Sequence, residues 1–251
     1  MEKERFTIGE AAKYLQVSID TLRRWDASGK LRAERSAGGH RYYLLLDLKR
    51  FRADLDAIGE VWAASDQPPN IPEEYYCEHA DRFNARLNRF AADLRAANTP
   101  ASTSESEAGI SDNLIPLVVA IAGEIGDNSF AHNLGSWPDL PGVYFAYDVR
   151  KRLAVLADRG QGVLKTLRRV KPDLDNDRDA LVTAFTEFLS GRAPERRGNG
   201  LKFVREISET NFIGLRFQSG IAVVSIPREP GCMEVISASR NIRGTLARID
   251  F

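Results

Sequence analysis

The N-terminal fifth of the chain alternates short amphipathic segments with turn-forming ones. Apolar residues three and four positions apart predict two short helices, over residues 7–15 and 18–25, separated by a tight turn. Ser18 stands where the second helix begins, and its hydroxyl oxygen can accept a hydrogen bond from the free amides of the first turn. The glycine-containing stretch 29–43 predicts a hairpin wing with Arg41 at its tip. The expected core residues are Ala11, Leu15, Val17, Leu22 and Trp25.

A longer helix is predicted over residues 76–97. Its apolar residues recur at alternating spacings of four and three, at Tyr76, Ala80, Phe83, Leu87, Phe90, Leu94 and Ala97. This is the spacing of a coiled-coil seam, kept for about three heptads. The pattern favours pairing with the same helix of a second copy, which would make the protein a homodimer. A single amphipathic helix lying on a neighbouring domain is the alternative.

The remaining apolar segments predict an α/β domain. A helix is expected from Leu114 through the polar cluster around Glu124, and further helices over 179–189 and 201–208. Apolar runs typical of strands lie at 142–147, 152–157, 214–218, 221–226 and 245–251, with a weaker one at 233–237. We expect an α/β two-layer sandwich in which helices cover one face of a mixed sheet, so the whole chain is of the α+β class.

Two polar stretches rich in Pro or Ser, residues 64–72 and 98–107, interrupt this pattern and are typical of linkers. The domain organisation follows from them. In chain order, the sequence predicts a domain of two short helices and a hairpin wing at 1–62, a linker at 63–74, the amphipathic helix at 75–97, a flexible linker at 98–111 and the α/β domain at 112–251.

Composition adds a charge bias and a location. The chain has 35 basic and 35 acidic residues, but residues 1–52 hold twelve Lys and Arg against seven Asp and Glu, a net charge of +5 that suits contact with phosphates. No apolar run approaches the roughly 20 residues of a membrane span, and the charged start differs from a secretory signal. We therefore expect a cytoplasmic protein with no membrane partner. Cys77 and Cys232 lack the spacing of a disulfide framework or a zinc site.

The N-terminal motifs resemble a known family. Thr21-Leu22-Arg23-Arg24-Trp25-Asp26, Ser28-Gly29-Lys30-Leu31 and Gly39-His40-Arg41-x-Tyr43 are similar to the winged helix-turn-helix of the MerR and excisionase families. The resemblance implies that the helix around 18–25 reads the major groove of double-stranded DNA while the wing contacts its backbone or minor groove. The residues expected to contact DNA are Ser18, Thr21, Arg23, Arg24, His40, Arg41 and Tyr43. Arg23 and Arg24 could instead be solvated surface charges. MerR regulators also dimerise through a helix after this module, which favours pairing of 76–97.

Three polar clusters in the C-terminal half suggest a nucleotide site. They are Glu124-x-x-x-Asn128-x-x-x-His132, Asp158-x-Gly160-x-Gly162 and Arg197-Gly198-Asn199-Gly200-Leu201. The amide oxygen of Asn128 is a hard ligand that suits Mg²⁺, and Glu124 could orient or deprotonate a water molecule. Asp158 could accept a hydrogen bond from an exocyclic amine, and glycines before a helix allow its amides to face phosphates.

In this order, the clusters resemble the motifs of the histidine-kinase-like (GHKL) ATPase superfamily, which includes gyrase B and the serine-kinase anti-sigma factors. The resemblance implies ATP and Mg²⁺ as cofactors. Glu124 would be catalytic and Asn128 would bind the metal, in the asparagine box. The other nucleotide-binding residues would be Asp158, Gly160 and Gly162 on the adenine side and Gly198, Gly200 and Leu201 on the phosphate side, with 163–197 as a lid and Gly244-Thr245 as the closing motif.

Departures from that superfamily narrow the function. His79 lacks the context of a phosphoacceptor, and the domain that supplies a phosphate-contacting lysine in gyrase-type enzymes is absent from the sequence, so we expect slow hydrolysis at most. The favoured hypothesis is a DNA-binding regulator controlled by Mg-ATP. His132 resembles a feature of the anti-sigma serine kinases, so the alternative is a protein serine kinase acting on a STAS-like partner. A degenerate nucleotide fold used for protein interaction is a third hypothesis.

Overall fold

The computed structural model describes residues 4–15, 17–27, 29, 31–36, 38–52, 54–98, 110–187, 200–229 and 231–251. The chain forms two compact units, one built on Met1–Asp54 and the other on Leu55–Asn98 and Gly109–Phe251. The division falls at residue 54, so the predicted boundary after residue 62 is wrong.

The N-terminal unit joins three helices to a small antiparallel sheet. Its elements are β1 (Arg5–Thr7), α1 (Ile8–Leu15), α2 (Ile19–Ala27), β2 (Glu34–Arg35), β3 (Arg41–Leu44) and α3 (Leu45–Arg52). Strand β3 lies between β1 and β2 and pairs antiparallel with both. Buried Leu22, Leu31 and Leu48 centre the core, with Trp25 and Phe51 packed at its margin. The predicted helix pair and wing are confirmed, and β1 is an additional strand.

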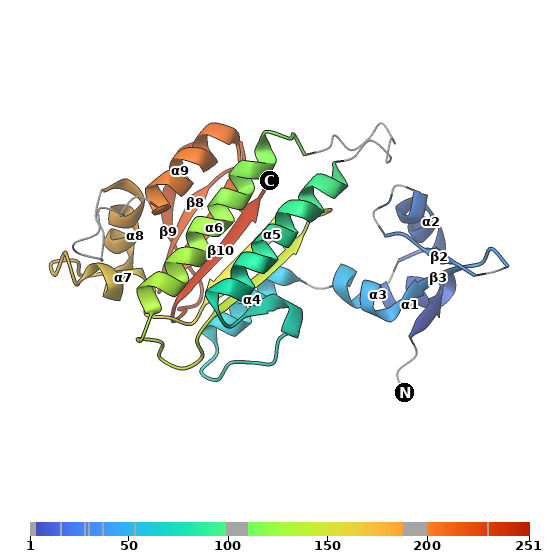
Figure 1. Ribbon diagram of the computed structural model, residues 1–251, viewed down its shortest axis with the longest axis horizontal. Helices are drawn as coiled ribbons and strands as arrows, with labels where there is room; N and C mark the ends of the chain where they lie inside the picture. The colour runs from blue at the N-terminus through green and yellow to red at the C-terminus, as the bar shows by residue number, and fades with distance from the viewer. Residues whose placement is uncertain are drawn as a thin grey trace. The chain divides into compact units, whose positions relative to one another are not determined.

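The C-terminal unit is a seven-stranded sheet covered by helices (Figure 1). Its helices are α4 (Leu55–Ala64), the short 3-10 helix η1 (Glu73–Tyr75), α5 (Ala80–Ala97), α6 (Leu114–Asn133), α7 (Gly162–Leu167), α8 (Asp177–Thr186) and α9 (Gly200–Asn211). Its strands are β4 (Tyr76–Cys77), β5 (Val143–Asp148), β6 (Leu153–Asp158), β7 (Gly214–Ser219), β8 (Ala222–Ile226), β9 (Glu234–Ser237) and β10 (Thr245–Asp250). The order across the sheet is β4-β5-β6-β10-β7-β8-β9.

Every pairing among the described strands of this sheet is antiparallel, so the expectation of a mixed sheet is wrong. The expected strands themselves are confirmed, and β4 was not predicted. The interior strand β6 is buried along its whole length, which explains its uninterrupted apolar run: a strand covered on both faces need not alternate.

Helices cover both faces of the sheet rather than one. Helices α5, α6 and α9 lie over the face that presents Phe145 and Leu156 to the main core (Figure 1). Tyr144 and Val155 precede these two residues in their strands and therefore point to the opposite face. Helix α4 lies on that face, because a Cβ on its Gly59 would be 3.1 Å from both Tyr144 and Val155. Helix α4 is therefore part of this unit and not of the N-terminal one, contrary to the predicted domain at 1–62.

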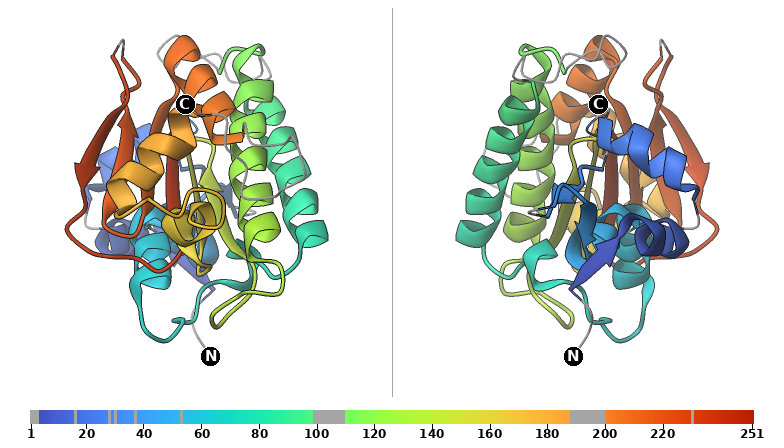
Figure 2. Two further views of the ribbon diagram at one scale, coloured as in Figure 1. Left: turned by 90° about the vertical axis from the view of Figure 1, so that its left-hand side faces the viewer. Right: turned by 90° about the vertical axis from the view of Figure 1, so that its right-hand side faces the viewer.

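The apolar seam of α5 is buried within the chain. Phe83, Phe90 and Leu94 are fully buried against α6 and the sheet, and the rings of Phe83 and Phe145 lie 5.5 Å apart. The ring of Phe83 occupies the space beside Gly126 of α6, where a Cβ would collide with it. The two helices run side by side in both views of Figure 2. The arrangement is the amphipathic-helix alternative, and it buries the seam that the predicted coiled coil would need.

Helix α6 is the only helix among the described residues with the length and apolar content of a membrane span. Its Val118, Ile121 and Ile125 pack into the core between α5 and the sheet. These contacts explain its apolar composition as that of a core helix.

Candidate functional site

The first and third polar clusters meet where α9 begins beside α6. Glu124 and Asn128 lie one turn apart on α6, with His132 one turn further on. A Cβ on Gly200, the first residue of α9, would lie 2.6 Å from Glu124 Oε2 and 2.9 Å from Asn128 Nδ2. Glycine at this position leaves the ends of Glu124 and Asn128 in place, whereas a larger residue would displace them. Gly198 lies outside the described residues, and Leu201 packs half-buried against the core.

The second cluster centres on Asp158 at the end of β6, whose side chain is almost wholly buried. Its carboxylate accepts hydrogen bonds from Ser129 Oγ at 2.9 Å, from Gly160 N at 2.7 Å and from the hydroxyl of Thr245, the residue opposite it on β10. Asn133 Nδ2 is a more distant donor at 3.5 Å. These donors hold the carboxylate in one orientation beneath α6.

Burial raises the pKa of Asp158 above its ordinary value, and the hydrogen bonds from Thr245, Gly160 and Ser129 only partly oppose this shift. Sequence reasoning missed Ser129 and Asn133. Ile125, Ser129 and Asn133 follow one another at intervals of four residues on α6, so all three lie on the side of the helix that faces the sheet. A polar side chain at such a position needs a buried partner, and that was the available signal.

The residues after Asp158 connect this cluster to α6 and α7. Gln161 N donates to Asn133 Oδ1 at 2.8 Å, and Gln161 Nε2 donates to the backbone oxygen of His132 at 3.1 Å. Gly162 starts α7 with a φ of 74°, a left-handed conformation that glycine adopts without strain. The segment from Asp158 to Gly162, called the glycine motif below, is therefore a tight turn that is hydrogen-bonded to the C-terminal end of α6.

Arg159, the residue between Asp158 and Gly160, points away from this cluster and is fully buried. Its guanidinium donates to the backbone oxygens of Trp62 and Ser65 at the end of α4, the latter at 2.8 Å. It also forms an ion pair of 2.6 Å with Asp139. Partial burial pushes the pKa of Asp139 up, but the contacts with Arg159, the hydrogen bond from the Leu140 amide and the charge of Arg243 together outweigh that effect and lower it. Arg159 thus joins the glycine motif to α4.

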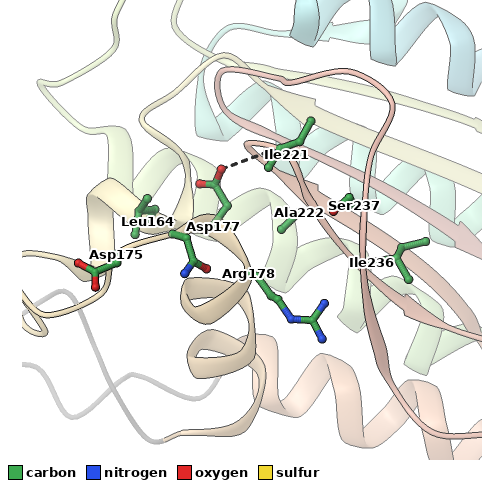
Figure 3. Close-up of a pocket in the computed structure, with 9 residues that line it drawn as sticks. Leu164, Asp175, Asp177, Arg178, Ile221, Ala222, Ile236 and Ser237 are labelled. Atoms are coloured by element: carbon green, nitrogen blue, oxygen red, sulfur yellow. Dashed lines mark hydrogen bonds between the residues drawn. The ribbon is translucent and has the colours of Figure 1, made fainter.

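A separate pocket of about 470 Å³ lies between the start of α8 and strands β8 and β9 (Figure 3). The half-exposed side chains of Ile221 and Ile236 line it. Asp177 accepts a hydrogen bond from Ile221 N at 3.1 Å, and Arg178 donates to the backbone oxygen of Val235. Asp177 and Arg178 are therefore engaged in holding the edge of the sheet, and the predicted site residues are not among the lining of this pocket.

On the N-terminal unit, Ser18 and Thr21 serve the start of α2. Ser18 Oγ accepts a hydrogen bond from Thr21 N at 3.0 Å and lies 2.9 Å from Thr21 Oγ1, which confirms the predicted helix cap. Arg23 forms an exposed ion pair of 3.0 Å with Asp20, and Arg24 is exposed. The outward side of α2 therefore presents two arginines to solvent.

The wing places its predicted residues differently. His40 is exposed at the turn, but Tyr43 is 1% exposed and its hydroxyl donates to Leu22 O at 3.4 Å. The prediction that Tyr43 contacts DNA is wrong, since β3 turns this side chain into the core. The neighbouring Tyr42 faces outward and donates to Glu34.

Asp26, in the last turn of α2, binds both strands of the wing. Its Oδ2 accepts from Arg41 Nε at 2.6 Å and from Arg35 Nη2 at 2.8 Å, and its Oδ1 accepts from Ala33 N at 2.9 Å. Partial burial pushes the pKa of Asp26 up, but the bond from Arg41, the bond from Ala33 and the charges of the two arginines outweigh it and lower the pKa.

Comparison with known families decides the nature of this unit. The profile of the MerR family regulatory proteins matches residues 7–43, which run from α1 to β3. Residues 7–43 form a MerR-type helix-turn-helix domain. The chain is also similar to the Type II methyltransferase M.Eco47II of Escherichia coli, at 46% identity over 52 residues. That match spans 20% of this chain and 12% of the methyltransferase.

The MerR-type domain makes the N-terminal unit a DNA-binding one, as in transcription regulators of that family. Helix α2 is the second helix of the motif, the position that is termed the recognition helix in helix-turn-helix domains, and the β2–β3 hairpin is the wing. Of the residues predicted to contact DNA, the exposed Arg23, Arg24 and His40 and the partly buried Arg41 lie on these two elements. Ser18 and Thr21 are engaged in capping the start of α2.

Proposed function

We propose that the protein is a DNA-binding regulator whose C-terminal unit binds Mg-ATP, and that the nucleotide controls the binding of DNA or of a partner. The observation that carries this proposal is the meeting of separate segments along the C-terminal half of α6. Gly200 of α9 adjoins Glu124 and Asn128, while the glycine turn after Asp158 is fastened to the same helix at Asn133. The resemblance to histidine-kinase-like ATPases supplies the identity of the ligand.

The side chains present fit Mg²⁺ bound together with phosphates. Magnesium commonly takes one or two protein oxygens and completes its shell with phosphate and water, so the Asn128 amide oxygen beside the Glu124 carboxylate is a sufficient protein contribution. Among the described residues, no three His, Cys, Asp or Glu side chains gather into a metal site of their own. The metal would therefore depend on the nucleotide, and Glu124 would orient the attacking water.

Asp158 can accept a hydrogen bond from the exocyclic amine of adenine if one of its present donors gives way. Its oxygens already accept hydrogen bonds from the protein, and the Asn133 amide at 3.5 Å is the longest and weakest of those contacts. We infer that a bound base replaces this amide, whereas Ser129, Gly160 and Thr245 keep the carboxylate oriented. The affinity for adenine then depends on how easily Asn133 moves.

Control over DNA binding would pass through α4. This helix begins at Leu55, directly after the N-terminal unit, and its end is held by Arg159 from the glycine motif. Tyr144 of the central sheet also binds its first residue, with a hydroxyl that donates to Leu55 O at 2.9 Å. A shift of the glycine motif upon nucleotide binding would therefore move the segment that leads into the DNA-binding unit, which is the form that a two-state switch takes.

Calorimetric titration with Mg²⁺ and a non-hydrolysable ATP analogue tests the nucleotide site. We expect binding by the wild type and a loss of roughly tenfold or more in affinity for Asn128→Ala, because a bond to a charged partner contributes about 1.5–3 kcal/mol. Asn211→Ala is the matched control, since Asn211 lies at the far end of α9 from Gly200 and its side chain donates to Ile207 O at 2.9 Å within that helix. Equal affinities for the three proteins, or no binding at all, would refute the site.

A further inference from the structure

The position of Asp26 in α2 needs an explanation. It lies in the last turn of the helix, where the negative end of the helix dipole disfavours an acidic side chain. Its side chain is only 9% exposed, although carboxylates are rarely buried unless they are paired. Its contacts supply the reason: one carboxylate holds Arg35, Arg41 and the backbone of Ala33.

These contacts fix the direction in which Arg41 extends. Asp26 accepts a hydrogen bond from Arg41 Nε at 2.6 Å, so this edge of the planar guanidinium faces the carboxylate and the opposite edge points away from it. The Arg41 side chain is still 33% exposed, and Arg35, on the paired strand, is 47% exposed. The wing arginines are therefore held at a set position relative to the recognition helix while part of each faces solvent.

The same carboxylate weakens non-specific attraction to DNA. Phosphate binding without sequence preference depends on the number of free positive charges, whereas specific binding depends on the geometry between recognition helix and wing. The negative charge of Asp26 lowers the net positive charge of the unit by one, and its bonds fix the positions of Arg35 and Arg41. Its effects on the two modes of binding are opposite in sign.

We propose that Asp26 is a specificity-determining residue, which positions Arg41 and Arg35 for the cognate site and lowers the affinity for other DNA. The proposal rests on DNA binding by the MerR-type domain. Asp26→Asn keeps the size of the side chain and an oxygen for Ala33 N but releases the arginines. On random-sequence DNA the variant binds as tightly as the wild type or tighter, and on the cognate site it binds about tenfold more weakly or worse.

The experiment uses the full-length protein, a random duplex and a site selected by the wild type from randomised duplexes. Fluorescence anisotropy at several salt concentrations gives both affinities and their salt slopes. On random DNA, the slope for Asp26→Asn should steepen by about one phosphate contact, or about 0.9. If the wild type selects no site, the DNA-binding function itself fails, which is distinct from failure of this inference.

Asp20→Asn is the matched control. Like Asp26, Asp20 pairs with an arginine, but this partner is Arg23 of α2 rather than a residue of the wing, and Asp20 is 87% exposed. The substitution should strengthen both modes of binding together and leave their ratio within about threefold. Arg41→Lys adds a test that keeps the charge: its specific affinity falls while its salt slope on random DNA stays the same. The inference is overturned if the ratio of specific to random affinity is unchanged in Asp26→Asn, or falls equally in Asp20→Asn, or is unchanged in Arg41→Lys.

Discussion

Gly200→Ala should separate the stability of the C-terminal unit from its affinity for nucleotide. The new Cβ would lie 2.6 Å from Glu124 Oε2 and 2.9 Å from Asn128 Nδ2, closer than non-bonded atoms allow. Both neighbours are the ends of side chains, so they can move aside while the backbone stays in place. The substitution therefore displaces the two groups that would place the metal and the water.

The two effects differ in size. Gly200 is the first residue of α9, where alanine stabilises the protein by about 0.4–1 kcal/mol by restricting the unfolded chain. This gain offsets the small cost of moving two side chains, so the free energy of unfolding should change by less than about 1 kcal/mol. Loss of one bond to a charged ligand costs about 1.5–3 kcal/mol. We therefore expect the dissociation constant for the Mg-bound ATP analogue to rise roughly 10- to 100-fold.

Urea denaturation gives the free energy of unfolding, and calorimetric titration gives the dissociation constant for the nucleotide analogue. Gly123→Ala is the control. Gly123 lies on α6, as Glu124 and Asn128 do, but it faces α5, where its Cβ would be 3.3 Å from Leu87 Cδ2. The substitution can change stability but should leave the affinity for nucleotide unaltered. Wild-type affinity in Gly200→Ala would refute the assignment of this corner of α6 as the nucleotide site.

Three further predictions concern stability. Phe83→Ala should lower the free energy of unfolding by about 3–5 kcal/mol in urea denaturation, because the ring is fully buried between α5, α6 and β5; dissociation of a dimer with unchanged stability would favour a coiled coil instead. Arg159→Lys offers three donors in place of five, so it should cost about 1–3 kcal/mol by leaving buried carbonyl oxygens unpaired, and a variant as stable as the wild type would contradict the anchoring role. Burial raises the pKa of Asp158 above 3.8, so the folded protein takes up this proton before the unfolded one as the pH falls. The stability of the wild type relative to Asp158→Asn should then rise as the pH drops through the raised pKa towards 3.8, and a fall measured by thermal melting would reverse the sign of the argument.

Local patterns predicted most elements because each depends on neighbouring residues. The apolar run of β6 and the cap at Ser18 are visible in the sequence, and both are found in the structure. The partner of an apolar face is not local information. The seam of α5 has the same spacing whether it packs on a second copy or on α6, so only the fold distinguishes the two cases. The same reasoning applies to α4, which could have belonged to either unit.

The candidate site shows the same limit. Glycines and carboxylates in an ordered motif pointed to Asp158 and Gly200, but the burial of Arg159 could not be anticipated, because arginine is ordinarily exposed. Its partners Trp62 and Asp139 are distant in sequence. Tyr43 was misassigned for a related reason: the pairing of β3 with β1 decides which side of the wing faces the core.

The central claim is that nucleotide and DNA bind to one coupled protein. The direct measurement is the affinity for the selected DNA site by anisotropy with and without saturating Mg-bound ATP analogue, together with the affinity for the analogue by calorimetry with and without DNA. Linkage requires both ratios to be the same, and we expect a factor of roughly 5 to 150. Nucleotide binding that leaves the affinity for DNA unchanged would contradict the claim.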